Sequence, residues 1–144
     1  MAITSAICNS FKVEILTATH NFTASSGNTF NLALYTSSAT LNKSTTAYTT
    51  SNEVASSGGY TAKGKALTSV TPVLSTDTAV CDFSDVSWTS ASFTANGCLI
   101  FNDSHASDAA VCTIAFGGDK TVTSGTFTIE FPAASAGSAI IGIA

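Results

Sequence analysis

Polar and apolar positions follow two different periods along this chain. Near the N-terminus, Ile7, Phe11 and Ile15 recur at every fourth residue. This spacing places them on one face of a helix. The pattern predicts a short helix over about residues 4–17, whose apolar face packs on the rest of the domain or on a partner.

The start of this helix has a candidate cap, and the segment has a second interpretation. Thr4 or Ser5 can accept a hydrogen bond from the first free amides of the helix. The run over residues 11–15 also alternates between apolar and charged side chains, as a strand would. Residues 1–20 are therefore expected to form an N-terminal helix or ordered arm.

From Thr29 onward the period is two. Phe30, Leu32 and Leu34 alternate with smaller or more polar residues, which predicts a strand with one buried face. Further short strands are expected at 60–67, 79–83, 88–94, 98–101, 111–116, 126–131 and 140–143. The clearest is 126–131, which Pro132 ends because proline cannot donate to a central ladder.

Turn signals separate these strands. Asn96-Gly97 is typical of a tight hairpin, and 117–120 is a second glycine-rich turn. The polar stretch 102–108 predicts a hairpin loop centred on His105. Residues 37–59 are too polar for core strands and too long for an ordinary turn, so we expect an ordered loop that contacts a neighbouring subunit.

The fold class that follows is all-β. About eight short strands separated by turns are typical of a β-sandwich or a jelly-roll-like domain. The 144 residues suit a single domain, with the N-terminal helix or arm at about 1–20 and the sandwich at about 29–144.

Composition narrows the function. Charged residues make up only 10% of the chain, while serine and threonine together number 44, so hydroxyls hydrate the surface in place of charges. Five lysines, no arginine and a net charge of −4 disfavour nucleic-acid binding. The opening MAITSAICNSFK resembles no signal peptide, and no apolar run is long enough to cross a membrane, so we expect synthesis in the cytoplasm.

Four cysteines, at positions 8, 81, 98 and 112, match no zinc-binding spacing. A reducing cytoplasm favours free thiols, so we expect small buried apolar side chains. A hairpin centred on His105 places Cys98 opposite Cys112, and a centre half a residue away places Cys98 opposite Thr113.

Candidate catalytic and metal-binding groups are few. His20 has no associated nucleophile motif and is expected to lie partly exposed in a turn. Asp103, His105 and Asp108 offer too few oxygens for calcium and predict a solvated loop. Asp77, Asp82 and Asp85 lack the aromatic groove of a glycosidase, and Asp85 is expected to cap a turn. No cofactor, metal site or enzymatic activity is expected.

A family resemblance points the same way. The blocks MAITSAICNSFKVEIL, THNFTASSGNTFNLALYTSSATL and TSNEVASSGGYTAKGKAL, followed by DFSDVSWTSASFTANGCLIFND and GGDKTVTSGTFTIEFP, resemble small virion proteins of tailed bacteriophages. The resemblance implies a structural part of the particle, located in the virion. It implies either a capsid decoration (cement) protein, homotrimeric or otherwise oligomeric on the major capsid protein, or a tail-associated component.

Four residues are candidates for contacts with partners. Phe11 and Ile15 lie on the apolar face of the N-terminal segment. Tyr48 lies within the long polar loop and Tyr60 directly follows it, where exposed aromatic rings could contact a glycan or receptor in a tail module.

Overall fold

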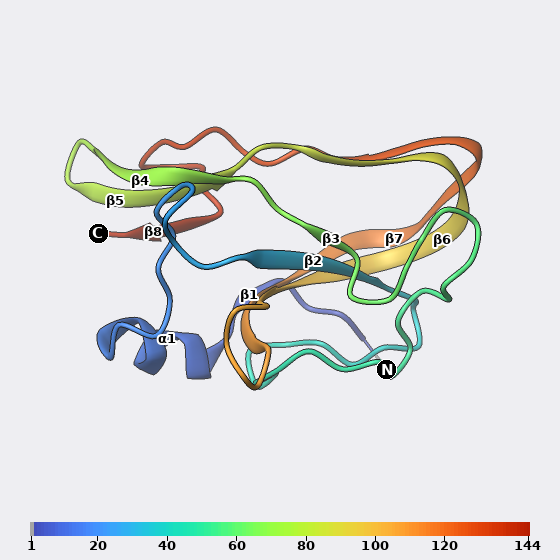
Figure 1. The fold of residues 1–144 in the computed structure, drawn as a ribbon, viewed down its shortest axis with the longest axis horizontal. Helices are drawn as coiled ribbons and strands as arrows, with labels where there is room; N and C mark the ends of the chain where they lie inside the picture. The colour runs from blue at the N-terminus through green and yellow to red at the C-terminus, as the bar shows by residue number, and fades with distance from the viewer. Residues whose placement is uncertain (1) are drawn as a thin grey trace.

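The computed structural model describes residues 2–144 and arranges them as two antiparallel sheets with one short helix (Figure 1). The elements in chain order are β1 (Ala6–Ile7), α1 (Asn9–Leu16), β2 (Phe30–Tyr35), β3 (Lys65–Ala66), β4 (Ser69–Ser75), β5 (Thr78–Phe83), β6 (Val86–Asn102), β7 (Ala109–Ile129) and β8 (Ile141–Ile143). The larger sheet has the order β1-β7-β6-β2-β3, and the smaller has the order β4-β5-β8. The expected all-β sandwich is confirmed.

The two longest strands form one hairpin that is bent back on itself. Near the loop 103–108, residues 97–102 of β6 pair with 109–115 of β7. At the far end Val86 pairs with Ile129, and this arm lies above the first (Figure 1). The register shifts several times between the two arms, and Ser90 and Ser124 adopt positive φ angles of 49° and 45°. Bulges of this kind bend a strand and increase its twist.

The two glycine-rich turn predictions are wrong, because both sequences lie inside these strands. A Cβ atom on Gly97 would lie 2.6 Å from the Ile114 carbonyl oxygen, so glycine is needed for a close approach rather than a turn. Gly117 and Gly118 have φ angles of 78° and 147°. They lie in a large bulge, where residues 116–119 of β7 are opposite the single residue Asn96 of β6.

The predicted hairpin around His105 is present, and the pairs at its base follow the expected centre half a residue away, but neither expected partner of Cys98 is correct. Asn102 pairs with Ala109 at its base, but a bulge before Cys112 shifts the later pairs by one residue. Ile100 is therefore opposite Cys112, and Cys98 is opposite Ile114. Directly opposed residues share a face, so Cys112 lies on the same face as Ile100. Ile100 and Cys98 are two residues apart on β6 and also share a face, so both cysteines lie on one side of the sheet.

The N-terminal segment contains both a strand and a helix. β1 pairs with β7, and α1 begins only after Cys8, which caps the helix without a side-chain hydrogen bond. The expected cap at Thr4 or Ser5 is wrong, because these residues bind β7. The Thr113 hydroxyl donates to the Thr4 carbonyl at 2.6 Å, and the Ala115 amide donates to Ser5 Oγ at 2.9 Å.

β2 is buried on both faces rather than on one. Ala33 and Tyr35 are as inaccessible as Leu32 and Leu34. The loop 37–59 covers the second face, where the Tyr35 hydroxyl donates to the Thr49 carbonyl at 2.7 Å. The loop has no core strand, as expected, and its polar backbone is tied to its own domain.

The C-terminal segment completes the smaller sheet. β7 ends at Ile129, shortly before Pro132, as predicted. The expected final strand is also present: Ile141 and Ile143 of β8 pair with Cys81 and Ala79 of β5. Across residues 2–144, no helix has the length and apolar character needed to cross a membrane.

Candidate interaction site

Phe11, the first predicted contact residue, is part of the domain's own core. It is 3% exposed, and its ring centroid lies 4.9 Å from that of His20 and 5.9 Å from that of Phe22. The prediction that this side chain packs on the rest of the domain is confirmed, which leaves it unavailable to a partner. Ile15 is only partly buried beside the core.

Tyr48 and Tyr60 form a hydrogen-bonded cluster around Glu53. The Tyr48 hydroxyl donates to Glu53 Oε2 at 2.6 Å, and the Tyr60 hydroxyl donates to Oε1 at 2.7 Å. The Lys63 amide also donates to Oε1 at 2.7 Å, and the Leu34 amide donates to the Tyr60 hydroxyl at 2.9 Å.

The expected exposure is therefore wrong for Tyr60, while Tyr48 is only partly buried. Tyr60 is 2% exposed, and the Tyr48 ring stacks on Phe101 with centroids 4.8 Å apart. Burial, reinforced by the Glu53 carboxylate, raises the pKa of Tyr48 to about 12 and that of Tyr60 further. Both hydroxyls stay protonated. The Tyr60 hydroxyl connects Glu53 of the polar loop to β2, and the Tyr48 hydroxyl holds Glu53 from within the loop.

His20 is buried, contrary to the expected exposed turn. Its Nδ1 lies 3.1 Å from Asn102 Nδ2, and its Nε2 lies 3.4 Å from Glu14 Oε1. Burial lowers the pKa of the imidazole, while Glu14 opposes the shift. In the described chain its side-chain partners are an amide and a carboxylate, which join α1 to β6 and include no nucleophile.

Lys63 joins the two carboxylates of the 103–108 loop. Its ammonium lies 3.0 Å from Asp103 Oδ1 and 2.8 Å from Asp108 Oδ2, and these contacts raise the pKa of Lys63. The lysine ammonium thus already neutralises both carboxylates and occupies the position between them that a metal ion would need. Within residues 2–144, no three His, Cys, Asp or Glu side chains are grouped to hold a metal.

Two of the three acidic residues around β5, Asp82 and Asp85, have structural partners, whereas Asp77 lies exposed between β4 and β5. Asp82 Oδ1 accepts a hydrogen bond of 2.8 Å from the Phe83 amide. Asp85 Oδ1 accepts one of 2.9 Å from the Phe131 amide. Asp85 therefore ties the end of β7 to the start of β6, instead of capping only its own connection as predicted.

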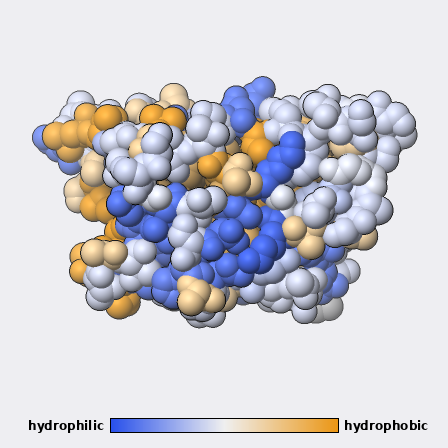
Figure 2. All heavy atoms as spheres, in the orientation of Figure 1, coloured by the Kyte–Doolittle hydropathy of each residue, from blue (hydrophilic) through white to orange (hydrophobic). Residues whose placement is uncertain are grey.

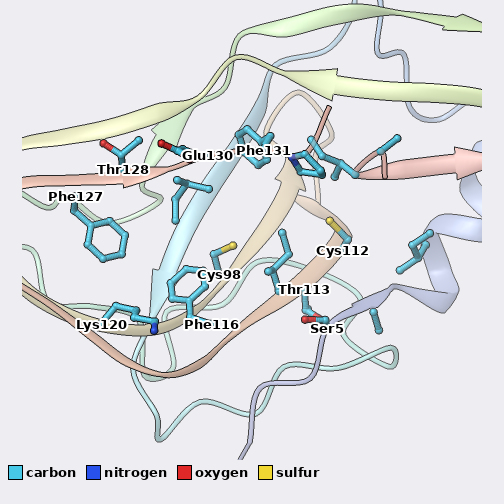
Figure 3. Close-up of a pocket in the computed structure, with 17 residues that line it drawn as sticks. Ser5, Cys98, Cys112, Thr113, Phe116, Lys120, Phe127, Thr128, Glu130 and Phe131 are labelled. Carbon is cyan, nitrogen blue, oxygen red and sulfur yellow. The ribbon is translucent and has the colours of Figure 1, made fainter. Parts of the chain in front are cut away.

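A groove of about 760 Å³ opens between the two layers along β7 (Figure 3). One wall carries Phe127 of β7 and Phe131 just after it, and the facing wall carries Cys98, Cys112 and Phe116 (Figure 3). The groove is mainly apolar. Sequence periodicity places these side chains on inner faces, but it gives no sign that the sandwich stays open on this side.

The thiols in and beside this groove are not activated nucleophiles. All four cysteines of the chain are free. Burial raises the pKa of Cys112 to about 12 and the pKa of Cys98 well above its usual value. Cys8, beside them, has its pKa raised to about 11, first by burial and then by Glu14.

An apolar surface at one end of the molecule was missed by the sequence analysis. Figure 2 shows apolar residues gathered at the end formed by α1 and the smaller sheet. The exposed large apolar side chains of the described residues are Val13, Leu16, Val70, Val73, Leu74 and Ile143. We call this set the apolar end.

The signal for this surface was present in the sequence. β4 reads SVTPVLS, an uncharged run in which Pro72 marks an edge strand. The strand was not predicted because its sequence does not alternate between apolar and polar residues. Nearly all of its residues are exposed, so neither face needs to be apolar.

Three features thus remain as candidates for function: the buried polar clusters that hold the loops, the groove along β7, and the apolar end. Only the groove and the apolar end are accessible to another molecule. Comparisons of the chain with protein-family models, curated proteins and solved structures find no match to any of them.

Proposed function

We propose that this chain is a non-enzymatic structural protein of a virion, acting as a decoration protein that binds between major capsid subunits. The observation that carries the proposal is the apolar end. Large apolar patches on an otherwise polar protein mark surfaces that bind other proteins. The resemblance of the sequence to phage virion proteins supports the choice of partner.

The exposed apolar side chains continue across the smaller sheet. Leu74 of β4 is opposite Ala79 of β5, which is opposite Ile143 of β8. Directly opposed residues lie on the same face. Leu74 is 70% exposed and Ile143 is 55% exposed, so this row presents a flat apolar strip to solvent.

A hollow of about 410 Å³ separates this sheet from α1. Ile15, Phe22 and Ile143 are among the residues that line it. Leu16, beside Ile15 at the end of α1, is 87% exposed. The helix and the sheet therefore offer a concave apolar surface into which a side chain of a capsid subunit could insert, with Ile15 as one contact.

The described site chemistry supports binding over catalysis. The buried histidine contacts no nucleophile, the buried thiols have raised pKa values, and the loop carboxylates are neutralised by Lys63. Because Tyr48 and Tyr60 are committed to Glu53, nothing at their positions favours glycan recognition.

Substitution at the apolar end tests this function. The variant carrying Leu16→Asp and Leu74→Asp should remain folded, because both side chains are exposed, but should no longer be retained on purified particles. Thr123→Asp is the matched control, since it adds a charge at an exposed position in the bend of β7. Equal retention of the double variant and the unaltered protein would show that the apolar end is not the binding surface.

Copy number then separates a capsid position from a tail position. Quantified protein bands from purified particles should give hundreds of copies for a capsid decoration protein. A small multiple of three or six copies would instead indicate a tail component, following the symmetry of tail assemblies. Complete absence from particles would contradict a virion role altogether.

A further inference from the structure

We propose that the groove along β7 accepts an extended segment of a neighbouring virion subunit as an added β-strand, with an acidic residue of that segment beside Lys120. This inference rests on the proposed function, because it names the chemistry of a partner segment. It concerns a surface separate from the apolar end.

The first support is an unpaired strand edge. β7 pairs with β6 along most of its length, but β1 covers its other side only at Cys112 and Thr113. Over the last residues of β7, no strand of residues 2–144 pairs with this outer edge. Exposed backbone donors and acceptors at such an edge can pair with another chain.

The groove follows this edge rather than lying only beneath the sheet. Its lining includes the six consecutive residues Phe127–Pro132. Successive side chains of a strand point to opposite faces. β7 ends at Ile129, so this alternation holds for Phe127 to Ile129, and a cavity that contacts all three must run along the backbone edge, where an added strand would lie.

The second support is the spacing of the apolar wall. Phe127 and Ile129 of β7, and Phe131 just beyond its end, are spaced two residues apart and line the groove. Ile129 and Phe131 are only partly buried. A strand pairing with this edge would direct every second side chain toward the same gap between the layers. Such pockets for alternate side chains are typical of recognition by strand addition.

The third support is charge. Lys120 lines the groove near Phe116 (Figure 3). Among the described residues, no carboxylate lies within 4.0 Å of its ammonium, and no hydrogen bond uses its side chain. An acidic side chain in the bound segment would supply the missing partner. Glu130, on the other wall, is likewise outside the ion pairs of the described chain.

An amphiphile with an anionic head, such as a fatty acid, could use the apolar walls and Lys120. It could not use the unpaired backbone edge, because it has no repeating amide groups. The lining by consecutive residues therefore favours a peptide strand, and the two occupants can be separated by experiment.

The test uses the full chain and defined peptide probes. Two acetylated eight-residue peptides alternate valine and threonine and carry one aspartate, placed first in one peptide and last in the other. We expect at least one to bind, by fluorescence polarisation, and to slow amide hydrogen exchange of residues 125–131. The same peptide N-methylated at every second residue, on the edge that would pair, should not bind.

Two lysine variants test the charge contact. Lys120→Glu should weaken binding of the acidic peptide by about threefold or more, because it removes the ion pair and places two carboxylates side by side. Lys43→Glu is the matched control, since Lys43 is exposed, lies outside the groove lining and should leave affinity unchanged.

Several outcomes would overturn the inference. These are failure of both peptides to bind, equal binding of the N-methylated peptide, or binding of palmitate at the groove when neither peptide binds. If the peptides fail while the variant with Leu16→Asp and Leu74→Asp is still lost from particles, only the strand-accepting groove is wrong. If that variant is retained and the peptides bind, the groove accepts a strand as proposed, but the apolar end is not the particle-binding surface.

Discussion

The Tyr60 hydroxyl donates a 2.7 Å hydrogen bond to Glu53 Oε1, seven residues earlier in the chain. The same hydroxyl accepts a hydrogen bond from the Leu34 amide in β2. One phenol thus joins a carboxylate of the polar loop to the backbone of a buried strand. The pair explains how a loop with little apolar content stays ordered on this domain.

Removing this hydroxyl should destabilise the protein. Tyr60→Phe keeps the ring but leaves the buried Leu34 amide without this acceptor and Glu53 with one donor fewer. An unsatisfied buried group costs about 1–3 kcal/mol, so the free energy of unfolding should fall by that amount. Urea denaturation measures it, with Thr123→Ala, at an exposed position, expected within about 0.5 kcal/mol of the unaltered protein. No change in Tyr60→Phe would mean that the cluster does not stabilise the fold.

Alanine substitutions of two apolar residues of α1 should have very different effects on stability. Phe11→Ala removes a buried ring and should lower the free energy of unfolding by about 3–5 kcal/mol. Leu16→Ala, at a position that is 87% exposed, should change it by less than about 0.5 kcal/mol. Thermal and urea unfolding of both variants give the comparison. Similar losses in the two would contradict the orientation of α1.

The lowered pKa of His20 predicts how the stability of the protein depends on pH. Its pKa in the folded protein lies below the ordinary value of 6.5, because burial disfavours the imidazolium. The unfolded chain therefore binds more protons as the pH falls below about 6.5, and the folded state loses stability there. Above that pH both states are neutral at this residue, and its full contribution is present.

Unfolding free energies between about pH 5 and about pH 7.5 should show this window. The increase with pH should be smaller in His20→Gln than in the unaltered protein. Thr123→Ala, at an exposed position in the bend of β7, should retain the full increase. Identical pH profiles for His20→Gln and the unaltered protein would show that the His20 pKa is not lowered on folding.

The cysteines should react as four separate thiols. Alkylation after denaturation without reductant should add four labels, measured by intact mass. In the folded protein, Cys81 should react first because it is only partly buried, while Cys98 and Cys112 are shielded and have raised pKa values. Two missing labels after denaturation would reveal a disulfide.

Periodicity predicted where several of the strands lie. The alternation of Phe127, Ile129 and Phe131, and that of Phe30, Leu32 and Leu34, marks strands that the structure contains. It could not reveal that the loop 37–59 buries the second face of β2, because that loop has no apolar period of its own.

The turn predictions at glycine were wrong because glycine is favoured both in tight turns and where another backbone approaches closely. Asn96-Gly97 has the composition of a hairpin turn, yet Gly97 is required by the nearby Ile114 carbonyl of the adjacent strand. Likewise, His20 has the local sequence of a surface turn, and its burial depends on Asn102, 82 residues away. Such contacts arise only once the strands have paired.

The bent hairpin of β6 and β7 also has a consequence for cooperativity. In a β-sandwich built from two separate sheets, the layers are held together by side chains that pack between them. Here both strands run through the bend from one layer into the other (Figure 1). Separating the layers therefore requires straightening or unzipping the hairpin itself, so opening of the core and loss of β-pairing become a single event.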